Sequence, residues 1–298
     1  MLDARAHPPE PASLITLKDG RTPAFLDVGP ADGAPVFHFH GHGSSRLEAL
    51  ALEQAAKKAR VRIIAPDRPG IGFSSPKNGD RLLDWPADVA EIADRLGVAR
   101  FAVQGMSAGG PYALATAHSL GTRVRAVSLV SAVPPPGFAL TAGPALRRLA
   151  WFVARAFPNY LRKRLREFRP DHVSEAMVRA RMLRIAEWLG GEDLRLMKDP
   201  AQLELLARTM LETGRQDGAG NRSEIERLVK PWGFNIRKIN TQIFLFHGEE
   251  DRIMHAGPLR RMAKALTHCR TVFYPGEGHF SVLVNRADEI LGALAGVT

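Results

Sequence analysis

Residues Arg100 to Leu120 read RFAVQGMSAGGPYALATAHSL, and this stretch decides the organisation of the whole chain. Its first residues form a short apolar run typical of a buried strand, and its second half is alanine-rich and typical of a helix. Between them lies Gly105 to Gly109, GMSAG, which places a G-x-S-x-G pattern at a predicted strand-to-helix turn. Side chains at both glycine positions would collide in so sharp a turn. We therefore predict that Ser107 is held in strained backbone geometry.

The context of this turn makes Ser107 a candidate nucleophile. A bare G-x-S-x-G pattern is more often a glycine-rich loop that happens to contain a serine, but the flanking strand and helix favour a functional turn. Met106 and Ala108 stand on either side of the serine. The start of the helix leaves backbone N–H groups without helical acceptors, and we expect that of Ala108 to point toward the serine.

Predicted strands and helices alternate along most of the chain. Apolar runs bounded by turn residues predict strands at residues 13–17, 22–28, 36–39, 61–65, 101–104, 124–130, 242–246 and 271–274. Helical spacing predicts helices at residues 47–60 and 84–96, from the serine turn to about 120, and at 257–266 and 282–295. This alternation indicates an α/β fold, with a mostly parallel sheet covered by helices on both faces.

The alternation is interrupted once, from about Pro134 to Lys238, where the pattern is helical and contains no convincing strand. We interpret residues 134–238 as a helical cap inserted into a core formed by residues 1–133 and 239–298. The cap holds 20 basic and 12 acidic residues, so most of the chain's net charge of +10 lies there. We predict that its large apolar residues mainly hold the cap helices together. The alternative is that they line an apolar pocket for an acyl or aryl group. These residues are Trp151, Phe152, Phe157, Tyr160, Met177, Met182, Trp188, Met197 and Met210.

The composition excludes several classes of protein. No stretch approaches 18 uninterrupted apolar residues, and the first ten residues lack the apolar core of a signal peptide, so we expect no stable membrane insertion. Cys269 is the only cysteine of the 298 residues, so no intrachain disulfide is possible, which suits the cytoplasm. The positive charge would suit nucleic acid, but no nucleic-acid motif and no block of five or six like charges accompany it. We therefore expect no nucleic-acid partner.

A serine nucleophile needs a base, and the base needs an orienting acid. His279 lies in GEGHF, just beyond the last predicted strand, and Asp251 lies in HGEED, just beyond the preceding one. Side chains at the carboxyl ends of parallel strands gather at one edge of the sheet. The chain order Ser107, Asp251, His279 matches the Ser…Asp/Glu…His order found in one type of fold.

Other residues compete for these two roles. Glu249 and Glu250 are alternatives to Asp251, which we prefer because it lies one short turn past the strand and precedes a helix. Of the other histidines, His118 lies within the helix that follows the serine. The end of the strand at 124–130 is a further place for an acid, but it is followed by Ser131, Ala132 and Val133, with no carboxylate.

A second loop supplies a candidate oxyanion hole. The residues His40, Gly41, His42 and Gly43 follow the third predicted strand. Attack on a carbonyl places negative charge on its oxygen, and two fixed N–H groups stabilise that charge. We assign these donors to the backbones of His42 and Ala108, with His40 and Gly41 as supporting residues.

Five motifs in this order resemble those of the α/β-hydrolase family. They are HG at 40–41 with SSR at 44–46, DRPGIGFS at 67–74, GMSAG at 105–109, GEED at 248–251 and GHF at 278–280. The resemblance implies a triad of Ser107, Asp251 and His279, a cap over the site, and a structural role for the Asp67 loop near the pocket. Relatives that cleave epoxides or carbon–halogen bonds carry aspartate in place of the serine. Gly43 departs from the proline that many relatives have there.

These residues lead to a functional expectation. We expect a serine hydrolase that cleaves a small-molecule ester, acyl or aryl, through an acyl-serine intermediate, without a cofactor or a metal ion. Activity should fall below about pH 6–7 as the histidine becomes protonated. Amide, lactone and carbon–carbon bond cleavage use the same triad and remain alternatives. A ligand-binding homologue without turnover and a nucleic-acid-binding protein are alternatives from other classes, and the substrate and the oligomeric state stay open.

Overall fold

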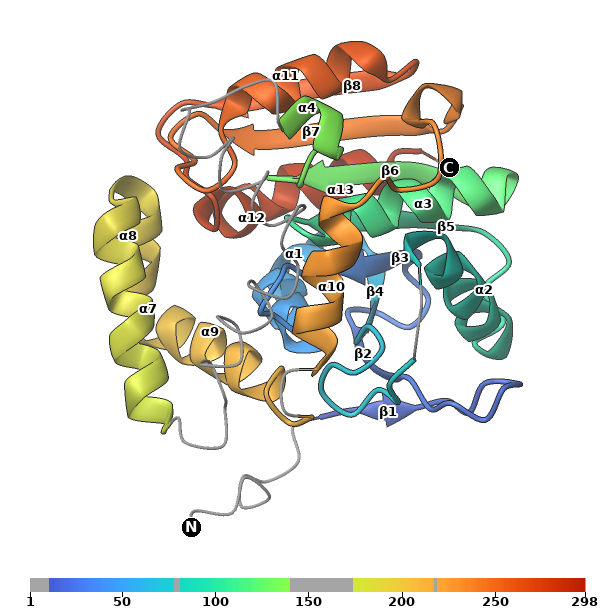
Figure 1. The fold of residues 1–298 in the computed structure, drawn as a ribbon, viewed down its shortest axis with the longest axis horizontal. Coiled ribbons are helices and arrows are strands. Elements are labelled where there is room, and N and C mark those ends of the chain that lie inside the picture. Colours follow the sequence, from blue (N-terminus) through green and yellow to red (C-terminus); the bar gives the residue numbers. More distant parts are fainter. Residues whose placement is uncertain (1–10, 78–80, 140–173, 217–218, 298) are drawn as a thin grey trace.

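A computed structural model describes residues 11–77, 81–139, 174–216 and 219–297 of the chain (Figure 1). Every strand predicted from the apolar runs is present in it. The strands are β1 (Ser13–Leu14), β2 (Ala24–Val28), β3 (Ala34–Phe39), β4 (Val61–Pro66), β5 (Phe101–Met106), β6 (Val124–Val130), β7 (Gln242–Gly248) and β8 (Cys269–Tyr274).

The eight strands form one sheet in the order β1-β2-β4-β3-β5-β6-β7-β8. The pairs β1–β2 and β2–β4 are antiparallel and the other pairs are parallel. In the central register Phe39 is paired with Gly105, and Gly105 is paired with Leu129. The carboxyl ends of β3, β5 and β6 therefore lie together, and those of β7 and β8 follow along the same edge. The expected α/β architecture is confirmed.

Helices cover both faces because residues in the strands alternate between two cores. Phe37, Val103 and Val127 belong to the core on one face, whereas Val36 and Ala102, one position away, belong to the core on the other. The first face is covered by α2 (Trp85–Arg95), α3 (Gly109–Leu120) and α11 (Ala256–Ala265), and the second by α1 (Glu53–Ala59), α12 (Ser281–Asn285) and α13 (Ala287–Ala295).

The described residues between β6 and β7 form helices joined by turns and irregular segments, with no strand among them. They form α4 (Pro136–Ala139), α7 (Glu175–Leu189), α8 (Gly191–Lys198), α9 (Pro200–Glu212) and α10 (Ala219–Val229). Asp199 begins α9 by accepting the N–H groups of Ala201 and Gln202, and Pro200 occupies the first helical position. Figure 1 shows α7 and α8 beyond the arrowheads of β6 and β7. We call residues 134–238 the insertion.

The large apolar residues of the insertion have several fates. Met182 and Met197 are buried in a small core of their own, which agrees with a role in holding the helices together. Met177 and Trp188 are more than half exposed. Trp151, Phe152, Phe157 and Tyr160 lie outside the described residues.

Two predicted helices are broken. A 3₁₀ helix (Arg46–Leu52) precedes α1, and at its first residue the buried Arg46 side chain donates to Asp67 at 2.6 Å and to Glu212 at 2.7 Å. The predicted C-terminal helix is divided into α12 and α13 at Arg286, whose side chain binds Glu277 at 2.9 Å. In both places the departure from the predicted helix coincides with an ion pair to a residue outside that helix.

Candidate active site

Ser107 occupies a sharp turn between β5 and α3. Its φ is +51°, a left-handed conformation that costs a serine roughly 1–2 kcal/mol. Three backbone hydrogen bonds hold the turn: Ser107 N–H donates to Val130 O at 2.9 Å, and Ser107 O accepts from Val133 at 2.9 Å and Gly110 at 3.1 Å. The strand β6 thus fixes the strained geometry.

The two glycines of the pattern are required by close backbone contacts. A Cβ at Gly105 would lie 2.4 Å from Gly109 O, and one at Gly109 would lie 1.9 Å from Phe39 O. Gly110 is a third such position, because its Cβ would lie 2.5 Å from the Cβ of Ala132. The G-x-S-x-G pattern predicts crowding at the first two glycines but not at the third, whose contact depends on a residue beyond β6.

His279 and Asp251 meet at the adjacent strand ends. His279 Nδ1 lies 2.8 Å from Asp251 Oδ2, and both side chains are buried. The other oxygen of Asp251 accepts the N–H groups of Ile253 and Met254, each at 2.7 Å. Two backbone donors on one oxygen and the imidazole ring on the other therefore fix the carboxylate in a single orientation.

The competing acids point elsewhere. Glu249 and Glu250 are exposed, and Glu249 pairs with Arg260. His118 stacks on Phe234, far along α3 from the serine turn.

A neighbour of Asp251 was not predicted from the sequence. His247 is buried in β7, with Nδ1 3.8 Å from Asp251 Oδ2. Burial lowers the pKa of His247 to about 4, so this ring is neutral beside the carboxylate.

The charges around His279 favour its protonated form. Burial alone lowers the pKa of His279, but the charge of Asp251 and its hydrogen bond raise it, with smaller contributions from Asp193 and Glu48, and the net shift is upward. Burial raises the pKa of Asp251, but its contacts with His279 and His247 and its backbone hydrogen bonds outweigh this and lower it. The pair therefore combines an ionised carboxylate with a more basic imidazole.

Residues 40–43 form a loop whose backbone carbonyls are bound by Arg68. This buried guanidinium donates to His40 O at 2.7 Å and to Gly41 O at 3.1 Å. It also donates to Glu224 of α10 at 2.5 Å, and the other oxygen of Glu224 lies 2.8 Å from His42 Nδ1. His40 is buried, and burial followed by the charge of Arg68 lowers its pKa well below the ordinary value.

The two backbone N–H groups assigned as oxyanion donors are both in this region. Ala108 immediately precedes α3 and His42 lies in the Arg68-bound loop, and both residues line the same pocket as Ser107. Within the described ranges, neither N–H is engaged in a protein hydrogen bond. The His42 ring also lines this pocket, with about a third of the side chain exposed.

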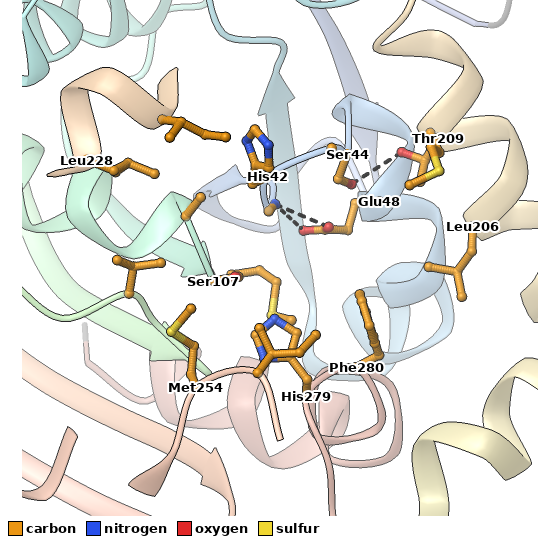
Figure 2. Close-up of a pocket in the computed structure, with 18 of the residues that line it drawn as sticks. His42, Ser44, Glu48, Ser107, Leu206, Thr209, Leu228, Met254, His279 and Phe280 are labelled. Carbon is orange, nitrogen blue, oxygen red and sulfur yellow. Dashed lines mark hydrogen bonds between the residues drawn. The ribbon is translucent and has the colours of Figure 1, made fainter. Parts of the chain in front are cut away.

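A pocket with a volume of about 430 Å³ joins these residues (Figure 2). Figure 2 shows Ser107 beside His279, with Met254 and Phe280 on either side of the imidazole ring. The wall is mostly apolar, as is usual for a site that binds a small molecule. The insertion contributes Met182, Leu206, Thr209, Met210, Ile225, Leu228 and Val229 to it. Two of the methionines singled out in the sequence therefore line the pocket.

One carboxylate faces this apolar pocket. Glu48 accepts the N–H of Gly41 at 3.2 Å and lies 3.0 Å from Nε2 of the buried His38. None of the described pocket residues is a lysine or an arginine. Glu48 was missed in the sequence, where it reads as an ordinary residue of an amphipathic helix.

Polar contacts fasten the insertion to the sheet. Thr209 Oγ1 of α9 accepts the N–H of Ser45 at 3.0 Å and binds its hydroxyl at 2.8 Å. Asp193 of α8 accepts the N–H groups of residues 279–281.

Across the described ranges, no group of three or more His, Cys, Asp and Glu side chains is arranged to hold a metal ion. No helix in the described part of the chain has the length and apolar character required to cross a bilayer.

A mostly parallel sheet, a serine on a strand-to-helix turn, and an acid and a histidine at neighbouring strand ends define a class of hydrolytic proteins. The chain belongs to the alpha/beta hydrolase fold family, whose model matches residues 34–286. This confirms the resemblance drawn from the motifs.

Individual relatives carry several activities. A bifunctional esterase/perhydrolase from Acinetobacter calcoaceticus is 33% identical over 123 residues, 41% of this chain and 45% of the relative. The chain spans less than half the length of several curated relatives that it matches, this one included. A 2-hydroxymuconate semialdehyde hydrolase from Pseudomonas putida is 25% identical over 255 residues, 84% of this chain and 82% of the relative. The crystal structure of a Rhodococcus esterase has a TM-score of 0.70 at 18% identity, covering 96% of this chain and 99% of that one, which shows the fold alone.

Proposed function

We propose that the protein is a serine hydrolase that cleaves a small-molecule ester through an acyl-serine intermediate. Ser107 is the nucleophile, His279 the general base and Asp251 the acid that orients it. One observation carries the proposal: His279, paired with Asp251 at 2.8 Å, lines the same pocket as Ser107, which adopts a left-handed conformation. The esterase activity named for one relative supports the ester assignment.

The reaction follows from these roles. His279 accepts the proton of Ser107 as its oxygen attacks the ester carbonyl, and then donates that proton to the leaving alcohol. A water molecule that transfers a proton to His279 attacks the acyl-serine and releases the acid. The backbone N–H groups of His42 and Ala108 donate to the carbonyl oxygen as it becomes negative, each worth roughly 3–4 kcal/mol in the transition state.

The serine and the base are adjacent but not yet hydrogen-bonded. In the described residues no hydrogen bond joins the Ser107 hydroxyl to the His279 ring. In free enzymes this contact is often long and shortens when the substrate fills the site. We infer that an acyl group in the pocket brings the two side chains into contact.

The pocket wall supports a neutral or cationic substrate. Its described residues are mostly apolar and include the carboxylate of Glu48 but no lysine or arginine. An anionic acyl group would face like-charge repulsion in a site of low dielectric constant.

Amide, lactone and carbon–carbon bond cleavage use the same three side chains and are alternatives to ester cleavage. The alternative from another class of protein is a homologue that binds its ligand without turnover.

We also propose that residues 134–238 act as a cap on a core of residues 1–133 and 239–298, because described helices of the insertion supply one wall of the pocket. The single cysteine supports a cytoplasmic protein. Nucleic acid is not needed to explain the charge of the insertion, because some of its arginines form ion pairs with its own carboxylates, such as Arg179–Glu204 and Arg215–Glu212.

A fluorophosphonate probe tests the nucleophile, with Ser107→Ala as the control. We expect the wild-type protein to be labelled and the variant to remain unlabelled. A series of p-nitrophenyl esters with acyl chains of increasing length then measures turnover and the depth of the pocket. Labelling without ester turnover would redirect the search to amides, lactones or carbon–carbon bonds. Folded protein that is not labelled would favour the binding homologue.

A further inference from the structure

Asp193 of the insertion binds three successive backbone amides of the segment that carries His279. Its Oδ2 accepts the N–H of His279 at 2.7 Å, and its Oδ1 accepts those of Phe280 at 2.9 Å and Ser281 at 2.8 Å. The side chain is only 1% exposed. A buried carboxylate is costly unless its oxygens are satisfied, and these three donors satisfy them.

This contact replaces the usual local stabilisation of a helix start. The first N–H groups of α12 lack helical acceptors, and such groups are commonly bound by a Ser, Thr, Asp or Asn at the residue before the helix. That residue is Phe280, which provides no such bond. The acceptor comes instead from α8, 86–88 residues earlier in the chain. The turn containing His279 therefore depends on the insertion for its shape.

Gly278 shows how closely the carboxylate is fitted. A Cβ at this position would lie 2.3 Å from Asp193 Oδ2 and 2.4 Å from its carboxyl carbon. The glycine of the GHF motif thus makes room for the carboxylate from another part of the fold. On the other side, Gly278 N–H donates to the hydroxyl of Ser281 at 2.8 Å, so that the turn is closed around Asp193.

We propose that Asp193 is a positioning residue for His279, which holds the base against Asp251 and places a second negative charge beside the imidazolium formed during catalysis. The proposal rests on the function proposed above. It makes helix α8 part of the catalytic apparatus: the base is correctly placed only when the insertion is seated on the sheet.

The charged groups that face the imidazole come from several elements. Asp251 follows β7, Asp193 lies on α8 and Glu48 lies in the 3₁₀ helix, and each favours the imidazolium. His247 of β7 also faces Asp251, but burial lowers its pKa to about 4 and keeps its ring neutral. Asp193 is the one of these carboxylates that contacts the backbone of His279, so its replacement changes both position and charge.

Asp193→Asn tests the proposal, because the amide keeps the size and one acceptor oxygen but loses the charge. Active sites are counted with the fluorophosphonate, so that poorly folded protein does not enter the rate. We expect kcat per labelled site to fall at least about tenfold with KM changed little, since small displacements of a catalytic group are costly. We also expect the acidic limb of the pH profile to move to lower pH.

Glu192→Gln is the matched control. The substitution removes the same charge from the residue next to Asp193 on α8. The Glu192 side chain, however, is partly exposed and pairs with Arg195 on the same helix. We expect it to leave kcat and the pH limb unchanged. An Asp193→Asn protein with wild-type kcat and an unshifted limb would overturn the proposal, as would equal effects of the two substitutions.

Two readouts are independent of turnover. Hydrogen exchange measures protection of the amides of residues 279–281, and NMR titration measures the pKa of the His279 ring. We expect faster exchange and a lower pKa in Asp193→Asn, and no change in either would contradict the proposal. Wild-type protein that the phosphonate does not label would refute the proposed function instead, while these readouts still decide whether Asp193 positions the ring.

Discussion

The ring of His279 lies 2.8 Å from the carboxylate of Asp251, and the two side chains reach this contact from loops that follow neighbouring parallel strands. A Cβ on Gly248, at the end of β7, would lie 2.3 Å from Glu277 O, so the two loops are in direct backbone contact. Glu250 N–H donates to the same carbonyl at 3.0 Å. The acid–base geometry is thus built into the edge of the sheet.

The first prediction concerns pH. The reaction needs neutral His279, and the net effect of its surroundings raises its pKa above the ordinary 6.5. Activity is therefore present above that raised pKa and is lost as the pH falls through it. We expect half-maximal kcat/KM at a pH above 6.5, measured with a neutral ester between pH 5 and 9 while circular dichroism monitors folding. A midpoint below pH 6 would contradict the assignment of the base.

The second prediction concerns the orienting acid. Asp251→Asn keeps an acceptor for the N–H groups of Ile253 and Met254 but presents a neutral amide to His279, which favours the wrong tautomer. We expect kcat to fall on the order of 10³- to 10⁴-fold. Glu250→Gln, one residue earlier and exposed, removes the same charge and should leave kcat within about twofold of wild type. Comparable losses in both variants would reassign the acid.

The third prediction concerns the serine turn. In Gly109→Ala the new Cβ would lie 1.9 Å from Phe39 O, so β3 or α3 must move. We expect the free energy of unfolding to fall by roughly 1–3 kcal/mol or more, with loss of phosphonate labelling. Gly292→Ala is the control, because that glycine is exposed in α13 with open space around it and alanine favours helices by about 1 kcal/mol. Urea unfolding measures both, and a neutral Gly109→Ala would refute the steric argument.

Much of the fold was predictable because its signals are local. The apolar run before Ser107 predicts a strand, and the alanine-rich segment after it predicts a helix. The two glycines indicate the turn between them. Asp251 and His279 each follow an apolar strand closely, so their meeting at one edge follows from a parallel sheet. The family match covering residues 34–286 confirms the fold that these local signals predict.

Contacts made by the insertion were not predictable in this way. Asp193 reaches a turn 86 residues away and Glu224 pairs with a histidine 182 residues away. In the sequence both read as ordinary charged residues of amphipathic helices, since no local pattern marks a carboxylate that becomes buried by helix packing. The ion pair of Arg286 with Glu277, at the junction of α12 and α13, likewise depends on how the loop folds back and has no local signal.

The last prediction concerns the charge of the substrate. Glu48 is the carboxylate among the described pocket residues, and its side chain is partly exposed. We expect esters with a cationic acyl group to be preferred over anionic ones of the same length. Glu48→Gln should lower that preference about tenfold, which corresponds to roughly 1.4 kcal/mol. The comparison is made above the acidic limb, since Glu48 also contributes to the pKa of His279.

Two controls isolate this effect from general damage to the site. A neutral ester of equal length reports any change in the catalytic groups themselves, and the ratios for charged esters are divided by its kcat/KM. Glu53→Gln removes a carboxylate that pairs with Lys57 on the surface of α1 and should leave the charge preference unaltered. An unchanged preference in Glu48→Gln would mean that the substrate's charged group does not approach this carboxylate, and that the apolar wall alone selects the acyl chain.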